Sequence, residues 1–172
     1  MNPIVHAELS WLVGARLAAR RDRVLVTLAG VAPDLDGLTL LAGEEAYGTY
    51  HHVLSHGLLS ASLCAAGMAL LAERKAVVGA LAFVTFHLHL LCDLAGSGPG
   101  WPIWYWWPFS LRQTMWDGQW NLASWQNSLI GLGATLAVLA CALPLGRTAV
   151  ELFSRRADEA VVKTLRARFG RS

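Results

Sequence analysis

Charged residues are scarce in this sequence. Only 15% of the 172 residues are Asp, Glu, Lys or Arg, whereas 55% are hydrophobic. No Lys or Arg occurs from Val24 to Glu73, and Arg112 is the one basic residue between Ala76 and Gly146. With a mean hydropathy of +0.42, the chain is too apolar for an ordinary soluble domain. This shortage of charge excludes a typical soluble protein and predicts a multi-pass membrane protein.

Cysteine is also rare. The three cysteines, Cys64, Cys92 and Cys141, lie in apolar runs, and no CxxC pattern occurs. An odd number without paired spacing excludes both a disulfide framework and a zinc knuckle, so we interpret them as buried thiols. A cleavable signal peptide is not expected at the N-terminus, because His6 and Glu8 interrupt its apolar part. No nucleic-acid-binding module is expected either, since no aromatic residues are interleaved with the basic ones.

Several apolar runs are long enough to cross a membrane. A bilayer core of about 30 Å requires about 20 apolar helical residues. Three runs meet this length without interruption: Val53–Ala72, Ala76–Gly96 and Ser128–Gly146. A fourth, Val24–Ala42, contains one Pro and two Asp, and the shorter Ile4–Ala19 either spans with tilt or lies at the interface. The sequence therefore predicts an all-α, multi-pass transmembrane helical bundle with about four to five membrane segments.

The basic residues are distributed unevenly along the chain. Seven of the 14 follow Gly146, which predicts a cytoplasmic C-terminus by the positive-inside rule. The loop 97–127, which carries seven of the eight Trp, is then on the outside. We divide the chain into a transmembrane domain, 1–146, and a basic amphipathic tail, 147–172. The tail either faces anionic lipid or packs against its own protein.

The histidines and several aspartates are expected near the outer ends of the predicted segments. This group comprises His6, Asp34, Asp36, His51, His52, His56, His87, His89 and Asp93. His89 and Asp93 are four residues apart and so share one helical face, as would His52 and His56. Neutral imidazole and carboxylate at this spacing suit zinc or another divalent transition metal. A dication would also offset the cost of burying carboxylates in a membrane.

Individual residues receive different predicted roles. The predicted metal ligands are His6, Asp36, His51, His56, His89 and Asp93. Asp34 or Asp36 is the candidate catalytic base. His52 and His87 are expected to contact the ligands or the substrate, because helical spacing turns His87 roughly 200° away from His89. Asp117, in WDGQW, is placed in the same group, with a simple turn residue as the alternative.

The ordered motifs resemble the YdjM family of bacterial inner-membrane, metal-dependent hydrolases. His6 matches the family's early His, and Pro33-Asp34-Leu35-Asp36 its PDxD motif. His51 and His56 have the spacing of its paired histidines, His89 and Asp93 match HxxxD, and Trp107-Pro108 matches the WP element. His52 stands where the family commonly has Arg. The resemblance adds Trp107 to the predicted contacts around the site.

This resemblance implies a function and a location. The family is distantly similar to zinc-dependent phospholipases C and single-strand nucleases. No His follows His89, so we expect one or two metal ions and no three-metal cluster. The expected protein is a hydrolase of the inner membrane, with its site facing outward, that cleaves a phosphoester in a lipid or amphiphile. The alternatives are a metal or proton transporter and a non-catalytic membrane protein with a structural metal.

Overall fold

The computed structural model describes residues 1–170, and within this range the chain is a bundle of helices. One isolated antiparallel bridge, between Ile103 and Thr114, is the sole β-type pairing in that range. The elements in chain order are α1 (Pro3–Gly14), α2 (Arg20–Val31), η1 (Ala32–Ala42), α3 (Glu44–Tyr50), α4 (Leu58–Leu71), α5 (Lys75–Gly96), α6 (Trp125–Ala140), α7 (Ala142–Leu145), η2 (Ala149–Leu152) and α8 (Arg155–Phe169). The all-α class is confirmed.

Three helical stretches are long and apolar enough to cross a membrane: Arg20–Ala42, Lys75–Gly96 and Trp125–Leu145. In the run that contains Pro33, Asp34 and Asp36, the α-helix α2 ends at Val31, and the chain continues directly into the 3-10 helix η1. Pro33 lies in the first turn of η1, where a missing N–H costs little.

The run Val53–Ala72 was wrongly predicted to be helical along its whole length. Its helix α4 begins only at Leu58 and has 14 residues. At 1.5 Å per residue this is about 21 Å, which is shorter than the bilayer core of roughly 30 Å. The residues before Leu58 form an irregular segment that carries three of the histidines.

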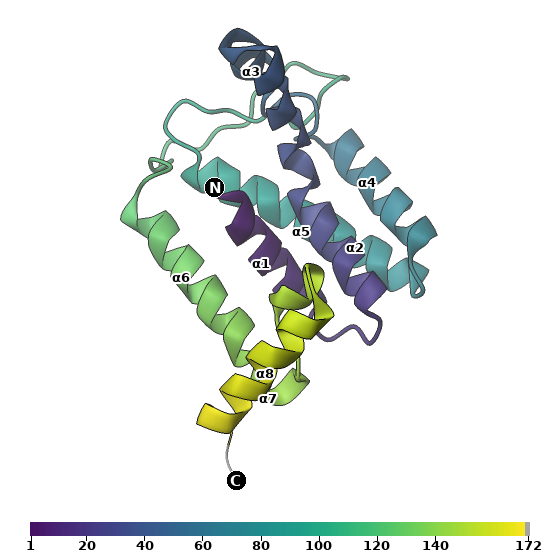
Figure 1. Cartoon of the computed structure of the whole chain (residues 1–172). Helices are drawn as coiled ribbons and strands as arrows, with labels where there is room; N and C mark the ends of the chain where they lie inside the picture. The colour runs from purple at the N-terminus through teal and green to yellow at the C-terminus, as the bar shows by residue number, and fades with distance from the viewer. Residues whose placement is uncertain (171–172) are drawn as a thin grey trace.

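The helices α2 and α5 pack side by side, with α1 and α4 against them and α6 against α1 (Figure 1). Gly30 allows α1 and α2 to approach closely, because a Cβ at this position would lie 1.8 Å from the Ser10 hydroxyl oxygen. One apolar cluster joins Leu17, Leu25 and Val78 from three segments of the bundle. In a membrane, close packing of such side chains, and not their removal from water, holds the helices together.

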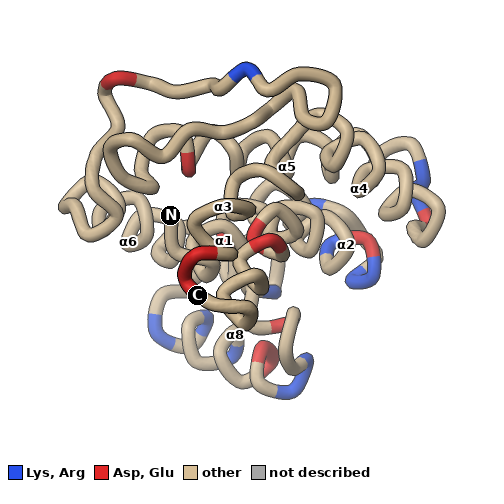
Figure 2. The backbone as a smooth tube through the Cα atoms, turned by 90° about the horizontal axis from the view of Figure 1, so that it is seen from above, with Lys and Arg blue, Asp and Glu red and all other residues tan. Residues whose placement is uncertain are grey.

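An ion pair and a hydrogen bond join the C-terminal segment to the bundle at the end opposite α3 (Figure 1). The buried Glu151 accepts hydrogen bonds from the Arg23 guanidinium and the Trp11 indole N–H. In α8, Asp158 accepts from Thr148, and Val162 is buried. This part of α8 therefore packs on its own protein, and Figure 2 shows Lys and Arg gathered on α2 and α8.

Candidate metal site

The histidines and aspartates meet at the end of the bundle where α5 ends and α1 begins. The 3-10 helix η1 supplies Asp34 and Asp36, the irregular segment 51–57 supplies three histidines, α5 supplies His89 and Asp93, and α1 supplies His6. His6, His52, His56, His89 and Asp93 are each at most 2% exposed. Segments far apart in sequence thus bring several ionisable side chains into one water-poor region.

Four residues could hold a metal ion. One ligand atom from each of Asp34, His56, His89 and Asp93 lies within 4.8 Å of the others. The Oδ2 atom of Asp93 lies 3.0 Å from Nε2 of His89 and 3.5 Å from Nε2 of His56, and His89 Nε2 lies 3.6 Å from Oδ1 of Asp34. Tetrahedral ligands about 2.05 Å from zinc would be roughly 3.3 Å apart. The observed separations therefore fit this geometry.

Hydrogen bonds fix the orientation of the two imidazoles in this group. Nδ1 of His89 lies 2.8 Å from the carbonyl oxygen of Gly30, and Nδ1 of His56 lies 2.9 Å from a carboxylate oxygen of Asp36. With the proton on Nδ1, each Nε2 presents a lone pair toward the other ligand atoms. Both Nε2 atoms are buried without a hydrogen-bond partner. Burying a hydrogen-bond acceptor without a donor costs free energy. The two Nε2 lone pairs and the nearby carboxylates therefore suit a bound cation.

Asp36 lies behind the four-residue group. Its Oδ1 contacts Nδ1 of His51 at 2.7 Å, and its Oδ2 contacts Nδ1 of His56 at 2.9 Å. The Asp36 side chain is 1% exposed. Because both carboxylate oxygens bind imidazoles, Asp36 orients His51 and His56.

His6 borders the four-residue group. Its Nε2 lies 3.2 Å from Oδ1 of Asp93, and its ring stacks on that of His89 with centroids 3.7 Å apart. The amino group of Met1 also contacts Asp93 Oδ1. One oxygen of Asp93 thus faces the N-terminal segment, while the other faces His56 and His89.

His52 is held in an uncommon backbone conformation. Its φ of 67° lies in the left-handed region, which few residues other than glycine adopt. The side chain is buried, with Nε2 3.7 Å from Oδ2 of Asp93. Burial and the neighbouring His56 lower the pKa of His52 to about 3. For His56, burial alone would lower the pKa, but the nearby carboxylates of Asp36 and Asp93 raise it to about 9. A bound cation would replace the proton on Nε2.

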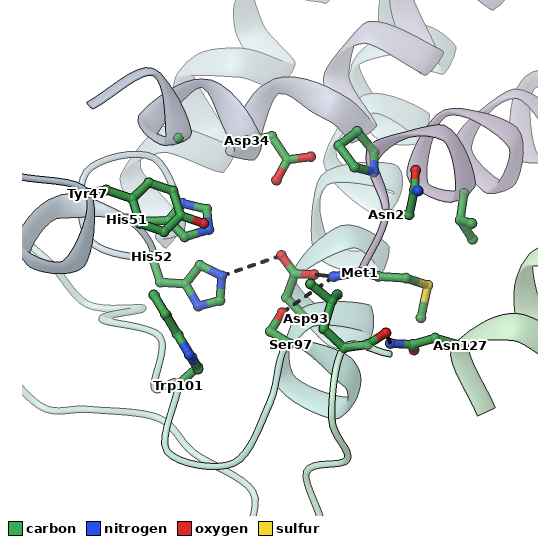
Figure 3. Close-up of a pocket in the computed structure, with 14 residues that line it drawn as sticks. Met1, Asn2, Asp34, Tyr47, His51, His52, Asp93, Ser97, Trp101 and Asn127 are labelled. Atoms are coloured by element: carbon green, nitrogen blue, oxygen red, sulfur yellow. Dashed lines mark hydrogen bonds and ion pairs between the residues drawn. The ribbon is translucent and has the colours of Figure 1, made fainter. Parts of the chain in front are cut away.

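A cavity of about 570 Å³ adjoins these residues (Figure 3). Its polar lining includes Asn2, Asp34, Tyr47, His51, His52, Asp93, Ser97 and Asn127, and its other lining residues include Met1, Pro3, Val5, Trp101 and Leu122. The volume is in the usual range for a small-molecule site, ~300–1,000 Å³. A molecule in the cavity would contact Asp34 and Asp93 directly.

The structure changes the expected arrangement of several predicted residues. Asp34, predicted as a base, joins the four ligand atoms, whereas Asp36, His51 and His6 lie next to this group and outside it. Whether these three bind metal stays a prediction. The segment with His52 and His56 was expected to be helical, but it is irregular. The ring centroids of the two residues are nevertheless 4.4 Å apart. The left-handed residue His52 produces this proximity without helical periodicity.

Three predicted contacts lie away from the cavity. His87 is on another face of α5, where its Nε2 lies 2.9 Å from the Tyr105 hydroxyl oxygen. Trp107 and the exposed Asp117 do not line the cavity, and Asp117 occupies a turn, which was the alternative interpretation. The sequence did not single out Trp101, whose ring lies 5.5 Å from that of His52. Its place in the Trp-rich loop 97–127 was the one feature of the sequence that could have indicated a role for Trp101 near the site.

Comparison with known proteins gave one match. The family model described as YdjM inner membrane protein matches residues 1–156. The matched range includes all the residues of the candidate site and ends near the start of α8. No match was found among the curated proteins or among the solved structures.

Proposed function

We propose that this chain, which belongs to the YdjM inner membrane protein family, is a membrane-embedded, metal-dependent hydrolase. One observation carries the proposal. Two imidazole Nε2 atoms without hydrogen-bond partners and two carboxylates converge at the wall of a cavity large enough for a small polar group. Zinc is the metal that suits this mixed set of nitrogen and oxygen ligands best. We propose that the site holds one or two zinc ions.

The residues around the group have distinct tasks in this proposal. His56, His89 and Asp93 would hold a divalent ion and leave the fourth tetrahedral position open for a water molecule. The ion would make this water acidic and would polarise an ester oxygen. The Asp34 side chain is 23% exposed, and its Oδ2 atom has no hydrogen-bond partner. Asp34 Oδ2 therefore accepts the proton released during hydrolysis. His51 and His52, on the same cavity wall, contact the polar part of the substrate.

The substrate we propose is a phosphoester of a lipid or another amphiphile. Asp34 lies in the second half of the spanning stretch Arg20–Ala42, and His89 and Asp93 lie in the last two turns of Lys75–Gly96. The site would therefore lie toward one face of the membrane, near the lipid headgroups. Most Lys and Arg residues lie at the other end of the bundle, around Arg23 and α8. By the positive-inside rule, this distribution supports a cavity on the outer side of the inner membrane and a cytoplasmic C-terminus.

The position of the polar cluster favours a hydrolase over a transporter. A transport path would need polar groups through the whole membrane thickness, but the histidines of the described chain are confined to one end of the bundle. A purely structural metal would favour a closed site. Asp34 and Asp93 instead line a cavity, which supports access for water and substrate.

The proposal can be tested with the full chain purified in detergent. We expect near-stoichiometric zinc by elemental analysis, and metal-dependent hydrolysis of bis(p-nitrophenyl) phosphate or of phosphatidylglycerol. Asp93→Asn removes a negative ligand and should abolish both metal retention and hydrolysis, whereas Leu129→Ala, on the exposed face of α6, should change neither. A folded wild-type protein that binds no divalent metal would overturn the proposal.

A further inference from the structure

The cavity beside the metal group has two chemically different walls. One wall carries the imidazoles of His51 and His52 and the carboxylates of Asp34 and Asp93. The other is mostly apolar, with Met1, Pro3 and Val5 from the N-terminal segment and Leu122 from just before α6, and it also carries the side-chain amides of Asn2 and Asn127. In Figure 3, His51 and His52 lie on one side of Asp93 and Met1 on the other. The cavity thus offers a polar and an apolar surface to the same occupant.

The apolar wall continues onto the lipid-facing surface of the bundle. Next to it, Ile4 is 67% exposed and Trp125 is 68% exposed, and Leu129 follows one turn later on α6 with 57% exposure. Trp125–Leu145 is a candidate membrane span, and only 17% of the residues in its apolar 18-residue window are buried. In a bilayer these exposed side chains would contact lipid acyl chains. The apolar wall of the cavity would then lie next to the hydrocarbon of the membrane.

The apolar lining residues lie at the N-terminal ends of α1 and α6, because the two helices pack against each other further along. The two helices pack closely at Gly131, where a Cβ would lie 3.2 Å from the Val5 side chain. One turn further along α1, Glu8 accepts a hydrogen bond from Thr135 at 3.0 Å. From Val5 toward the α8 end of the bundle, α1 and α6 are therefore in contact, whereas Pro3 and Leu122, which are both exposed, lie beyond this contact.

We propose that Pro3, Val5 and Leu122 form a subsite for the acyl chain of a membrane phospholipid, which enters sideways from the bilayer between the N-terminal ends of α1 and α6. The polar head lies against Asp34, His51, His52 and Asp93, and the first part of the chain lies against the apolar wall before it passes into the membrane. The position of the lipid headgroup in this inference rests on the proposed function. Binding of the acyl chain to the subsite does not require that the lipid is hydrolysed.

Photo-crosslinking can test the subsite in the intact protein. The zinc-loaded chain would be placed in nanodiscs that contain phosphatidylglycerol with a diazirine on its acyl chain near the glycerol. Mass spectrometry should find crosslinks concentrated on residues 1–5 and on Leu122. Val5→Trp and, separately, Leu122→Trp fill the subsite and should reduce these crosslinks about tenfold, in line with the cost of misfitting an apolar pocket. Leu129→Trp, on the outer face of α6, is the matched control and should leave them unchanged.

Metal content separates this inference from the proposed function. Each variant should retain the zinc content of the wild type, because none of the substituted residues belongs to the ligand group. Because Val5 packs against Gly131, Leu122→Trp provides a second test at a position outside the contact between α1 and α6. Crosslinks spread evenly over the exposed face of α6, or unaffected by either filling variant while zinc is retained, would overturn the acyl-chain subsite. Loss of zinc in the wild type would instead count against the hydrolase.

Discussion

Nε2 of His89 lies 3.0 Å from Oδ2 of Asp93, one helical turn further along α5. The Nδ1 atom of His89 is engaged with the carbonyl oxygen of Gly30, so the neutral ring places an acceptor lone pair against a carboxylate. Two acceptors at this distance repel each other unless a proton or a metal ion lies between them. This pair is therefore the strongest local indication of a cation site in the molecule.

The first prediction compares the two histidines of α5. His89→Gln removes an Nε2 atom from the ligand group and should sharply lower zinc content. His87→Gln should leave the zinc content close to that of the wild type, because His87 contacts Tyr105 on another face of the helix. Elemental analysis of both purified variants makes the comparison. Equal losses would show that the site is not organised around His89 and Asp93.

The second prediction concerns Asp36. Because this carboxylate orients His51 and His56, Asp36→Asn should weaken zinc affinity by about 10–100-fold, as is usual when a partner of a ligating histidine is lost. Zinc should still bind at saturating concentration with unchanged stoichiometry. A chelator competition titration measures the affinity, with Asp93→Asn as the comparison. Complete loss of zinc at saturation would instead place Asp36 among the ligands, as the sequence first suggested.

The third prediction is a pH dependence of stability at the other end of the bundle. Burial raises the pKa of Glu151, but hydrogen bonds from Arg23 and Trp11 outweigh it, so its pKa lies below the ordinary value. A lowered pKa means that the ionised form stabilises the fold above about pH 4.3, the value in an unfolded chain. This contribution should be lost as the pH falls through the folded pKa.

Circular dichroism of the detergent-solubilised chain can follow the effect through the apparent Tm. Glu151→Gln leaves Arg23 buried without its charge partner and should destabilise the protein by about 3 kcal/mol at pH 7. The variant should also lack the Glu151-dependent fall in Tm below pH 4. Glu159→Gln, an exposed substitution on α8, is the control and should have little effect. A variant whose Tm matches the wild type at pH 7 would contradict a stabilising role for the pair.

The fourth prediction is the orientation of the chain in the membrane. In a background without Cys64, Cys92 and Cys141, a cysteine introduced by Asp117→Cys should react with a membrane-impermeant maleimide in intact spheroplasts. A cysteine introduced by Glu159→Cys should react only after the membrane is permeabilised. Both positions are exposed, so access by the reagent depends on the side of the membrane. The reverse pattern would place the candidate site on the cytoplasmic side.

The segment 51–57 shows where prediction from sequence failed. A helical interpretation of HHVLSH placed His52 and His56 on one face, and the two rings are indeed adjacent. The cause is different, because His52 adopts a left-handed backbone and α4 starts only at Leu58. Contacts with residues distant in sequence, such as the bond from the Trp104 N–H to the His52 carbonyl, hold this conformation. Helical periodicity carries no information on such contacts.

The sequence by itself determined the helical bundle, its membrane location and the residues that gather near one end, because long apolar runs and the i, i+4 spacing of His89 and Asp93 are local properties. The tertiary structure decided which atoms of those residues face one another. Asp34 and Asp36 are two residues apart, yet one lines the cavity and the other binds two imidazoles from behind. That difference arises from packing between η1, α5 and the segment 51–57, whose separation in sequence makes their mutual distances invisible to any local pattern.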